Sequence, residues 1–273
     1  MKKFEVLCVT MHQNDFSLFE KMKINADAVF ANQTDHNLIE CAEINGHNVK
    51  MVSTDTRGVG LNRNISLLSA TAEICLLGDD DMVYREGYDK LIIEEFEKHP
   101  KADVIVFNIG CSTPQYGRIP TVVKNFKRFH KFSKNPFGAP RIAFRLSAIK
   151  RSNVAFSLLF GGGALYPSGE DTIWLESLLN AGLKIYLSPI FIGDVAYGES
   201  SWFDAAIEKK LYGYGAMLRA KKTALWQVYM LRYALKAHKK ISFFAALKLI
   251  SKGYGGYDRL ISFEDYINRR ENN

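Results

Sequence analysis

Short apolar runs alternate with amphipathic stretches over the first hundred residues of the chain. Continuous apolar runs bounded by polar residues are typical of buried β-strands, and these lie at Phe4–Thr10, Ala28–Ala31, Val49–Ser53 and Ile74–Leu77. Helical periodicity between and after them predicts helices at Asp15–Lys23, Asn37–Ile44, Leu61–Ala72 and Tyr88–His99. Strands that alternate with helices predict an α/β fold built on a mixed, mainly parallel sheet.

Polar residues follow each of the four predicted strands. In a parallel sheet the carboxyl ends of the strands share one edge, and such folds bind ligands there. The segments expected at this edge are Thr10–Gln13, Asn32–Asp35, Thr54–Arg57 and Asp79–Asp81. The side chains that we expect to contact a nucleotide are therefore Thr10, Asn32, Gln33 and Asp35.

The pattern changes after a further strand predicted at Val104–Asn108. Residues 112–145 are irregular, with four prolines and a basic stretch at Lys124–Lys134, and predict a long connection across the ligand-binding face. Three glycines at 161–163 precede a helix predicted at Thr172–Ala181 and a strand at Ile185–Phe191. The pattern then becomes helical. We therefore predict a catalytic domain over residues 1–204 and a helical segment over residues 205–273.

Composition and charge narrow the class of protein. The chain has 273 residues, of which 47% are hydrophobic and 24% charged, and this predicts a large globular domain. Its formal net charge of +7 is uneven, because residues from Ala205 onward carry 14 Lys and Arg against 5 Asp and Glu. That balance of +9 leaves −2 for residues 1–204. A basic segment favours anionic partners, either nucleic acid or an acidic membrane surface.

Several classes of site lack their signatures. The four cysteines form no CxxC pattern and the six histidines show no metal-ligand spacing, so we expect no zinc site. Neither GxSxG nor HExxH occurs, which argues against a hydrolase triad or a zincin. Met1–Thr10 shows no signal-peptide pattern, and no apolar run reaches the length of a membrane span. We therefore expect a cytoplasmic protein.

Asp79-Asp80-Asp81 is the strongest chemical signal in the sequence. Three adjacent carboxylates repel one another unless a cation or solvent separates them. Hard oxygen ligands suit Mg²⁺ or Mn²⁺, with substrate phosphates completing the coordination shell. A solvated acidic turn is the alternative interpretation, but the triplet directly follows the buried run Ile74–Leu77, and this position favours a metal site.

Two further groups of charged residues stand near predicted helix starts. Glu170 and Asp171 precede Thr172–Ala181, where carboxylates are common as simple caps. Together with an upstream metal site they become candidates for a general base. Arg57 and Arg63 flank a glycine-containing turn at a helix start, and both features are suited to binding phosphate.

In this order the motifs resemble those of family 2 glycosyltransferases, which have the GT-A fold. Arg63-Asn64 and Asp79-Asp80-Asp81 match the family's Arg-Asn pair and its DxD motif, within RGVGLNRN and EICLLGDDDMVY. About ninety residues later, Glu170-Asp171 in SGEDTIWLESLLNAGLKI match its Glu-Asp motif. The resemblance covers roughly residues 4–203, and the ordered combination is specific.

The resemblance implies an inverting transfer of a sugar from a nucleotide-diphosphate sugar, with UDP favoured, to an acceptor hydroxyl. It implies that Asp79 and Asp81 bind Mn²⁺ or Mg²⁺ at the donor diphosphate and that Asp79 and Asp80 contact the nucleotide sugar. It also implies that Asp171, with Glu170, is the catalytic base. A metal offsets the charge of a diphosphate leaving group, and a carboxylate accepts the hydroxyl proton. The implied setting is bacterial capsule, O-antigen or lipopolysaccharide synthesis, with a saccharide or lipid-linked saccharide as acceptor.

Two positions depart from the family's pattern. The end of the second predicted strand reads Ala31-Asn32-Gln33-Thr34-Asp35, where the family often has an acidic pair. This departure leaves the identity of the nucleotide open, although amide side chains can hydrogen-bond the edge of a uracil. Many members also carry a late metal-binding histidine, whereas Gly193–Phe203 contains none. Asp194 or Glu199 is a candidate replacement, unless the metal has fewer protein ligands.

Residues 205–273 admit two interpretations. Basic and apolar faces together describe a helix that lies at a membrane surface, and the aromatic residues concerned are Trp226, Tyr229, Tyr233, Phe243 and Phe244. This would hold the enzyme at the inner face of the plasma membrane. In the other interpretation the helices pack on the catalytic domain and merely expose their lysines.

Two other functions compete with glycosyl transfer. A nucleotidyltransferase that makes sugar nucleotides normally has a glycine-rich phosphate loop after its first strand, whereas this chain reads TMHQND there. A non-catalytic nucleic-acid-binding protein would use the basic segment, but the sequence has no recognised binding motif and the acidic triplet would be unexplained. We therefore expect no nucleic-acid partner.

Overall fold

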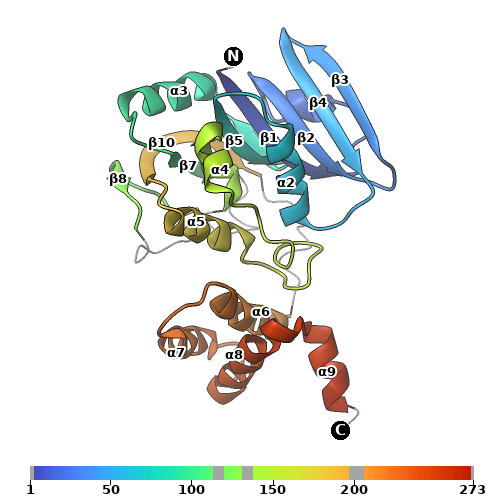
Figure 1. The fold of residues 1–273 in the computed structure, drawn as a ribbon, viewed down its shortest axis with the longest axis vertical. Helices are drawn as coiled ribbons and strands as arrows, with labels where there is room; N and C mark the ends of the chain where they lie inside the picture. Colours follow the sequence, from blue (N-terminus) through green and yellow to red (C-terminus); the bar gives the residue numbers. More distant parts are fainter. Residues whose placement is uncertain (1–2, 113–119, 131–137, 197–205, 272–273) are drawn as a thin grey trace. The chain divides into compact units, whose positions relative to one another are not determined.

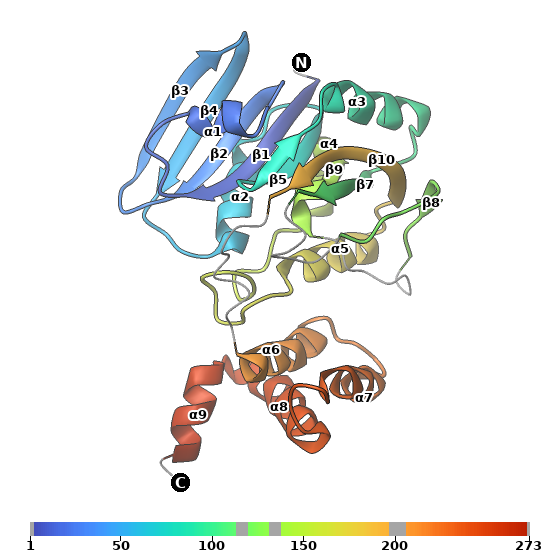
Figure 2. The same cartoon turned by 180° about the vertical axis from the view of Figure 1, so that it is seen from behind.

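A computed structural model describes residues 3–112, 120–130, 138–196 and 206–271 of the chain. Two compact units make up the protein, drawn from two sides in Figures 1 and 2. The first contains residues 1–57, 61–156 and 174–199, and the second contains residues 58–60, 157–173 and 200–273. The predicted domain boundary after residue 204 stays a prediction.

Within the described residues, a mixed sheet of ten strands forms the first unit. The strand order is β3-β4-β2-β1-β5-β9-β7-β10-β6, and β8 pairs with β10. Four neighbours at its centre are parallel: β1 (Phe4–Met11), β2 (Asp27–Gln33), β4 (His47–Thr54) and β5 (Ile74–Asp79). The others are β3 (Leu38–Ile44), β6 (Met82–Tyr84), β7 (Val104–Cys111), β8 (Lys127–Arg128), β9 (Ile142–Arg145) and β10 (Ile185–Val195). The predicted α/β class is confirmed.

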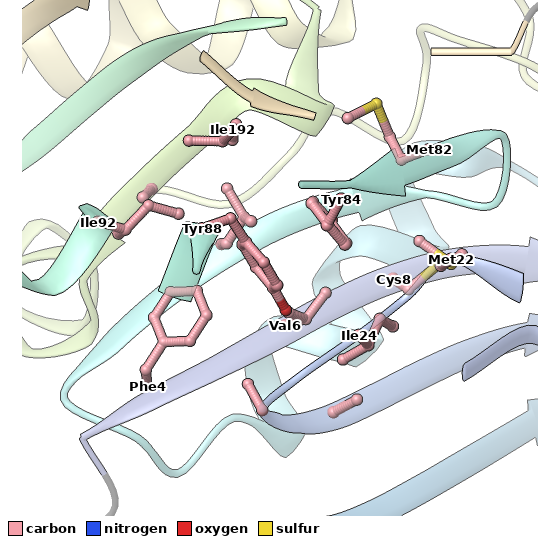
Figure 3. Close-up of a cluster of buried hydrophobic side chains, with 14 of the residues drawn as sticks. Phe4, Val6, Cys8, Met22, Ile24, Met82, Tyr84, Tyr88, Ile92 and Ile192 are labelled. Carbon is pink, nitrogen blue, oxygen red and sulfur yellow. The ribbon is translucent and has the colours of Figure 1, made fainter. Parts of the chain in front are cut away.

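Two hydrophobic clusters cover the two faces of this sheet, because side chains alternate along each strand. Phe4, Val6 and Cys8 of β1 point into the cluster drawn in Figure 3, which α1 (Ser17–Lys21) and α3 (Tyr88–Lys98) complete. Leu7 faces the other cluster, to which α2 (Val59–Ser69), α4 (Leu146–Ser152) and α5 (Glu170–Asn180) contribute. Burial on both faces explains why the central strands read as continuous apolar runs.

The prediction of a helix at Asn37–Ile44 is wrong, because Leu38–Ile44 form strand β3. It runs antiparallel to β4 across the two-residue turn Asn45-Gly46. Both turn residues have positive φ, 53° at Asn45 and 78° at Gly46, as a type I′ hairpin turn requires. Asn and Gly adopt this conformation at lower cost than other residues, so the dipeptide specifies the hairpin.

The prediction that residues 112–145 form an irregular connection is wrong for the end of that segment. A 3₁₀ turn, η1 (Ala139–Arg141), leads into β9, which lies between β5 and β7 and is antiparallel to both. Ile142, Ala143 and Phe144 are fully buried there. Residues 113–119 and 131–137, including part of the predicted basic stretch, lie outside the described residues.

Helices form most of the second unit. They are α6 (Ile207–Ala220), α7 (Trp226–Ala237), α8 (Phe243–Gly256), the 3₁₀ turn η2 (Tyr257–Arg259) and α9 (Phe263–Glu271). Gly215 and Gly253 let α6 and α8 approach closely, because a Cβ at either would lie 1.9 Å from a carbonyl oxygen of the other helix. Among the described residues, no helix has the length and apolar character needed to cross a membrane.

Candidate functional site

The polar strand ends lie at one edge of the sheet, as expected. Thr10 at the end of β1 is opposite Asn32 of β2, and Asn32 is opposite Ser53 of β4. On the other side of β1, Val9 is opposite Asp79, the last residue of β5. The parallel register therefore brings all four predicted segments to the carboxyl edge of β4, β2, β1 and β5, which we call the acidic edge.

Asn32 organises this edge. Its side chain is fully buried, and its amide nitrogen donates to the Gln13 carbonyl oxygen at 2.9 Å and to Ser53 Oγ at 3.0 Å. Its amide oxygen accepts a hydrogen bond from the Gln13 backbone N–H at 3.1 Å. The amide predicted to contact a nucleotide thus holds the loop after β1 against β2 and β4. The neighbouring Gln33 is buried as well.

The loops after β2 and β4 are joined by Arg57. Its guanidinium donates to the carbonyl oxygens of Thr34 and Thr56, at 2.6 and 2.9 Å. Asp35 has an exposed side chain that pairs with His36 Nδ1 at 3.0 Å. The hydrogen bond from His36 lowers the pKa of the Asp35 carboxyl below its ordinary value.

The start of α2 supports the acidic edge from one face of the sheet. Asn62 is fully buried and donates to the carbonyl oxygens of Ala31 and Thr10, at 2.7 and 3.3 Å. The next residue, Arg63, is 4% exposed and donates to Asp79 Oδ1 at 3.0 Å. Its guanidinium also lies over the ring of Phe156, 5.5 Å from the centroid. A buried arginine thus orients the first carboxylate of the triplet.

The other two carboxylates differ in their partners. Thr10 Oγ1 donates to Asp80 Oδ2 at 2.6 Å, although burial raises the pKa of the Asp80 carboxyl. Asp81 Oδ1 is buried without a hydrogen-bond partner among the described residues. Burial, together with the charges of Asp79 and Asp80, raises the pKa of Asp81 to about 7.

Such a carboxylate fits a divalent cation, because a cation would offset both the burial and the repulsion. In the described part of the chain, no three His, Cys, Asp or Glu side chains are grouped to hold a metal by themselves. Mg²⁺-type sites commonly use one or two carboxylates and take their remaining ligands from water and substrate phosphates.

Glu170 and Asp171 belong to the second unit, at the first turn of α5. Glu170 is buried and Asp171 is half-buried. The loop before them is tight: Gly161 has a φ of 104°, and a Cβ there would lie 2.9 Å from the Glu170 carboxyl carbon. Glycine is therefore required at 161 for both conformation and space.

Asp194, the candidate replacement for a late histidine, is held by Arg85. Two hydrogen bonds of 3.0 and 3.1 Å join the guanidinium to both carboxylate oxygens. The pair lines a hollow of about 810 Å³, with Lys23, Val83 and Ser112 among the other lining residues. Glu199, the other candidate, lies outside the described residues.

Sequence reasoning missed Asn62 and Arg85. Asn62 carried a usable signal, because a polar side chain beside Arg63 at a helix start was available to bind strand ends. Arg85 comes directly after β6 and follows the acidic triplet closely in sequence. Its pairing with Asp194 depends on the antiparallel contact of β6 with β10, in which Asp194 is opposite Val83.

Comparison with known families places the acidic edge in context. Residues 30–154 match the model of glycosyl transferase family 2. This region of the chain is therefore similar to family 2 glycosyltransferases. It begins within β2 and ends just after α4, so that it contains Asn32, Arg63 and the acidic triplet but not Glu170 and Asp171. The resemblance inferred from the motifs is confirmed. No curated protein matches the chain.

The structure is similar to crystal structures of TarS from S. aureus. TarS 1–349 in complex with UDP-GlcNAc matches with a TM-score of 0.62 and 13% identity, over 94% of this chain and 92% of that one. Its complex with UDP matches with a TM-score of 0.58 and 14% identity, over 96% and 93%. At these identities the likeness concerns the fold, and the predicted GT-A fold is confirmed. Family and fold together support sugar transfer from a nucleotide sugar.

Proposed function

We propose that the chain is an inverting, metal-dependent glycosyltransferase that uses a UDP-sugar as donor. The observation that carries the proposal is the acidic edge, where Asp79, Asp80 and Asp81 follow buried β5 and Asp81 keeps a buried oxygen that lacks a partner among the described residues. The similar TarS structures hold UDP-GlcNAc and UDP, which favours a uridine nucleotide.

Asp81, together with Asp79, would hold Mn²⁺ or Mg²⁺. Such a cation, when bound, neutralises charge that develops on the diphosphate leaving group. The protein's part is to orient the carboxylates in advance. Arg63 holds Asp79 and Thr10 holds Asp80, so less freedom is lost when the donor binds.

The nucleotide would lie along the loops that follow β1, β2 and β4. Asn32 shapes this surface through Gln13 and Ser53, while Gln33 and Asp35 stand next to it for contacts with base and ribose. Arg57 holds the loop after β4 and would contribute a positive charge to the binding of the donor phosphates. Opposite charges at hydrogen-bond distance give the strongest of these contacts.

We assign the role of general base to Asp171, with Glu170 beside it. The acceptor oxygen would form a bond to the anomeric carbon as the bond from that carbon to the diphosphate oxygen breaks, and Asp171 would take the hydroxyl proton. Attack opposite the leaving group inverts the anomeric centre. The support is the order of the motifs and the position of both carboxylates at the start of α5.

Asp171→Asn tests this role, since it keeps the shape and removes the proton acceptor. Donor binding should survive while transfer falls about 10²-fold or more. Binding is measured by calorimetry with UDP and Mn²⁺, and transfer by product formation. Glu40→Gln on exposed β3 is the matched control, and it should leave both unchanged. Transfer at the wild-type rate in the Asp171→Asn enzyme would show that another group is the base.

We also propose the acceptor class and the setting. A saccharide or lipid-linked saccharide would be the acceptor, in the synthesis of a bacterial capsule, O-antigen or lipopolysaccharide. The reaction would take place in the cytoplasm, with contact to the inner face of the plasma membrane and without a nucleic-acid partner. The basic charge of residues 205–273 supports the membrane contact.

The decisive experiment is a donor screen over UDP-, GDP- and dTDP-sugars with Mn²⁺, read as released nucleotide. We expect release from a UDP-sugar, lost in excess EDTA and restored by added metal. Nucleotide release that is unaffected by EDTA would contradict the proposed metal dependence. Formation of a nucleotide sugar from a nucleoside triphosphate and a sugar phosphate would instead identify a nucleotidyltransferase.

A further inference from the structure

Helix α7 of the second unit is apolar on two opposite sides. Its inward side is well packed: the ring of Trp226 stacks on Tyr254 and that of Tyr233 on Tyr214, with centroids 4.0 Å apart in each pair. Ala234 and Ala237 are buried in the same cluster, between the helices. These contacts account for the attachment of α7, so the apolar residues on its other side are not needed for it.

The outward side carries a row of exposed aliphatic residues. Leu225, Val228, Leu231 and Leu235 are 69%, 57%, 44% and 60% exposed. Spacings of three and four residues place them along one side of the helix, which we call the outer row. Over this length a helix extends about 15 Å. Exposed leucines scattered singly need no explanation, whereas a continuous row is typical of a surface with a partner.

Positive charge borders the outer row. Arg232 and Lys236 of α7 are exposed, as are Lys239 and Lys240 in the turn that follows. From Lys209 to Tyr257 the sequence contains eleven Lys and Arg and no acidic residue. Two of them, Lys209 and Arg219, pair with Glu264 and Asp258. The segment that contains α7 therefore combines apolar side chains with one sign of charge.

We propose that the outer row of α7 docks on an anionic lipid surface. The row would enter the boundary between headgroups and acyl chains, and Arg232, Lys236, Lys239 and Lys240 would contact lipid phosphates. A helix with this division of residues lies in the plane of the interface. This inference rests on the membrane contact proposed above and names the residues that would make it, and it holds for any donor sugar.

Charge decides between this surface and other partners. A second copy of the chain would bring two basic faces together, and like charges oppose such a contact. A nucleic acid would match the charge but offers no apolar layer for leucines. A lipid surface supplies both complements at once, since its acyl region receives the row and its headgroups carry the negative charge.

The structure also changes which residues would make the contact. Of the five aromatic residues considered from the sequence, Trp226, Tyr233 and Phe243 pack within the second unit. Tyr229 and Phe244 are exposed, at 42% and 80%. The apolar contact therefore comes mainly from the leucines and Val228, with Tyr229 beside them.

Co-sedimentation of the full chain with vesicles tests the proposal. Phosphatidylcholine vesicles with and without phosphatidylglycerol are compared at low ionic strength and in about 1 M NaCl, where the screening length is about 3 Å. We expect binding that rises with phosphatidylglycerol and is lost in salt. A wild-type chain that ignores phosphatidylglycerol vesicles at low salt would overturn the proposal.

Two sets of variants locate the surface. Lys236→Glu/Lys239→Glu/Lys240→Glu should lower the partition coefficient at least about tenfold. Lys90→Glu/Lys101→Glu/Lys184→Glu makes the same charge change at exposed sites of the first unit and should lower it by about twofold at most. Equal losses would mean that net charge, and not this face, binds lipid.

Val228→Gln/Leu231→Gln/Leu235→Gln removes the row without changing charge and should lower binding about tenfold, because less apolar area is buried. Unchanged binding would overturn the apolar part of the proposal. A lipid-free dimer in sedimentation that this variant abolishes would assign the row to a second copy. Nucleotide release from the donor should be the same in all these variants, so failure here is separate from failure of the proposed reaction.

Discussion

The acidic edge of the sheet and the outer row of α7 depart from the usual rule of burial in opposite directions. At the edge, Asp81 keeps a buried carboxylate oxygen without a partner among the described residues. On α7, four aliphatic side chains are exposed although the opposite side of the helix is packed. A buried charge costs free energy in the free protein, whereas an exposed leucine only forgoes the gain of burial. In each case a ligand of matching character would remove the mismatch.

The two regions differ in the hydrogen bonds that hold their side chains in place. Hydrogen bonds from Thr10, Asn62 and Arg63 hold the edge, and each joins elements that are distant in sequence. The outer row has no such network, because apolar contacts with a surface need no orientation. Single changes at the edge should therefore have large and specific effects, while single changes on α7 should have small effects that add.

Removal of the Asp81 carboxylate should have the largest effect. In Asp81→Ala, transfer should fall about 10³-fold or more, because the metal supplies several kcal/mol to the transition state. UDP affinity in Mn²⁺ should also fall, as measured by calorimetry. Glu40→Gln on exposed β3 should change neither quantity. Full wild-type activity in excess EDTA would remove the basis for this prediction.

Loss of the ion pair between buried Arg63 and half-buried Asp79 should have the next largest effect. Arg63→Met leaves the Asp79 carboxylate without its arginine, and we expect the free energy of unfolding in urea to fall by about 2–3 kcal/mol. Lys3→Met breaks the surface pair with Glu97, in which both side chains are more than half exposed, and should cost less than about 1 kcal/mol. Similar losses in the two variants would show that Arg63 has no special role in the stability of the edge.

The raised pKa of Asp81 predicts that replacing this carboxyl by a neutral amide stabilises the folded protein at high pH. In the folded state this carboxyl binds its proton more tightly than in the unfolded state. The free energy of unfolding of the wild type should therefore fall as pH rises from about 4 to about 7, where the folded protein must lose that proton. Without metal at pH 8, Asp81→Asn should therefore be more stable than the wild type by about 1–3 kcal/mol. At pH 4 the difference should disappear.

Added Mn²⁺ provides the control for this gain. It should raise the melting temperature of the wild type and leave that of Asp81→Asn nearly unchanged, since a bound ligand stabilises only the state that binds it. Thermal unfolding in EDTA and in Mn²⁺ measures both effects. An Asp81→Asn protein that is less stable than the wild type at pH 8 in EDTA would contradict the electrostatic account of Asp81.

The central strands could be predicted from sequence because both of their faces are buried. β1, β2, β4 and β5 appear as apolar runs, and the polar residues after them lie together at one edge of the sheet, as predicted. β3 could not be recognised by periodicity, since Leu38 and Ile39 are both exposed on an edge strand. The turn dipeptide Asn45-Gly46 was the available signal for this hairpin.

Long-range pairing explains what the sequence could not reveal. β9 is a four-residue strand whose position follows from its pairing with β5 and β7. In the same way, the carboxylates of the edge were predictable as residue types, but their partners were not. Asn32 bound to Ser53, and Asp194 bound to Arg85, depend on strands that meet only in the folded chain.

The smallest effect should come from the outer row of α7. Val228→Gln/Leu235→Gln replaces two exposed aliphatic residues by a residue that favours helices, so the free energy of unfolding should change by about 0.5 kcal/mol or less. Ile250→Ala, at a fully buried position of α8, should cost about 2–4 kcal/mol in the same urea titration. If the two outer-row residues proved as costly as Ile250, they would serve to stabilise the second unit. A change in the free energy of unfolding near zero, combined with weaker binding to phosphatidylglycerol vesicles, would instead mean that these residues serve to bind lipid and not to stabilise the fold.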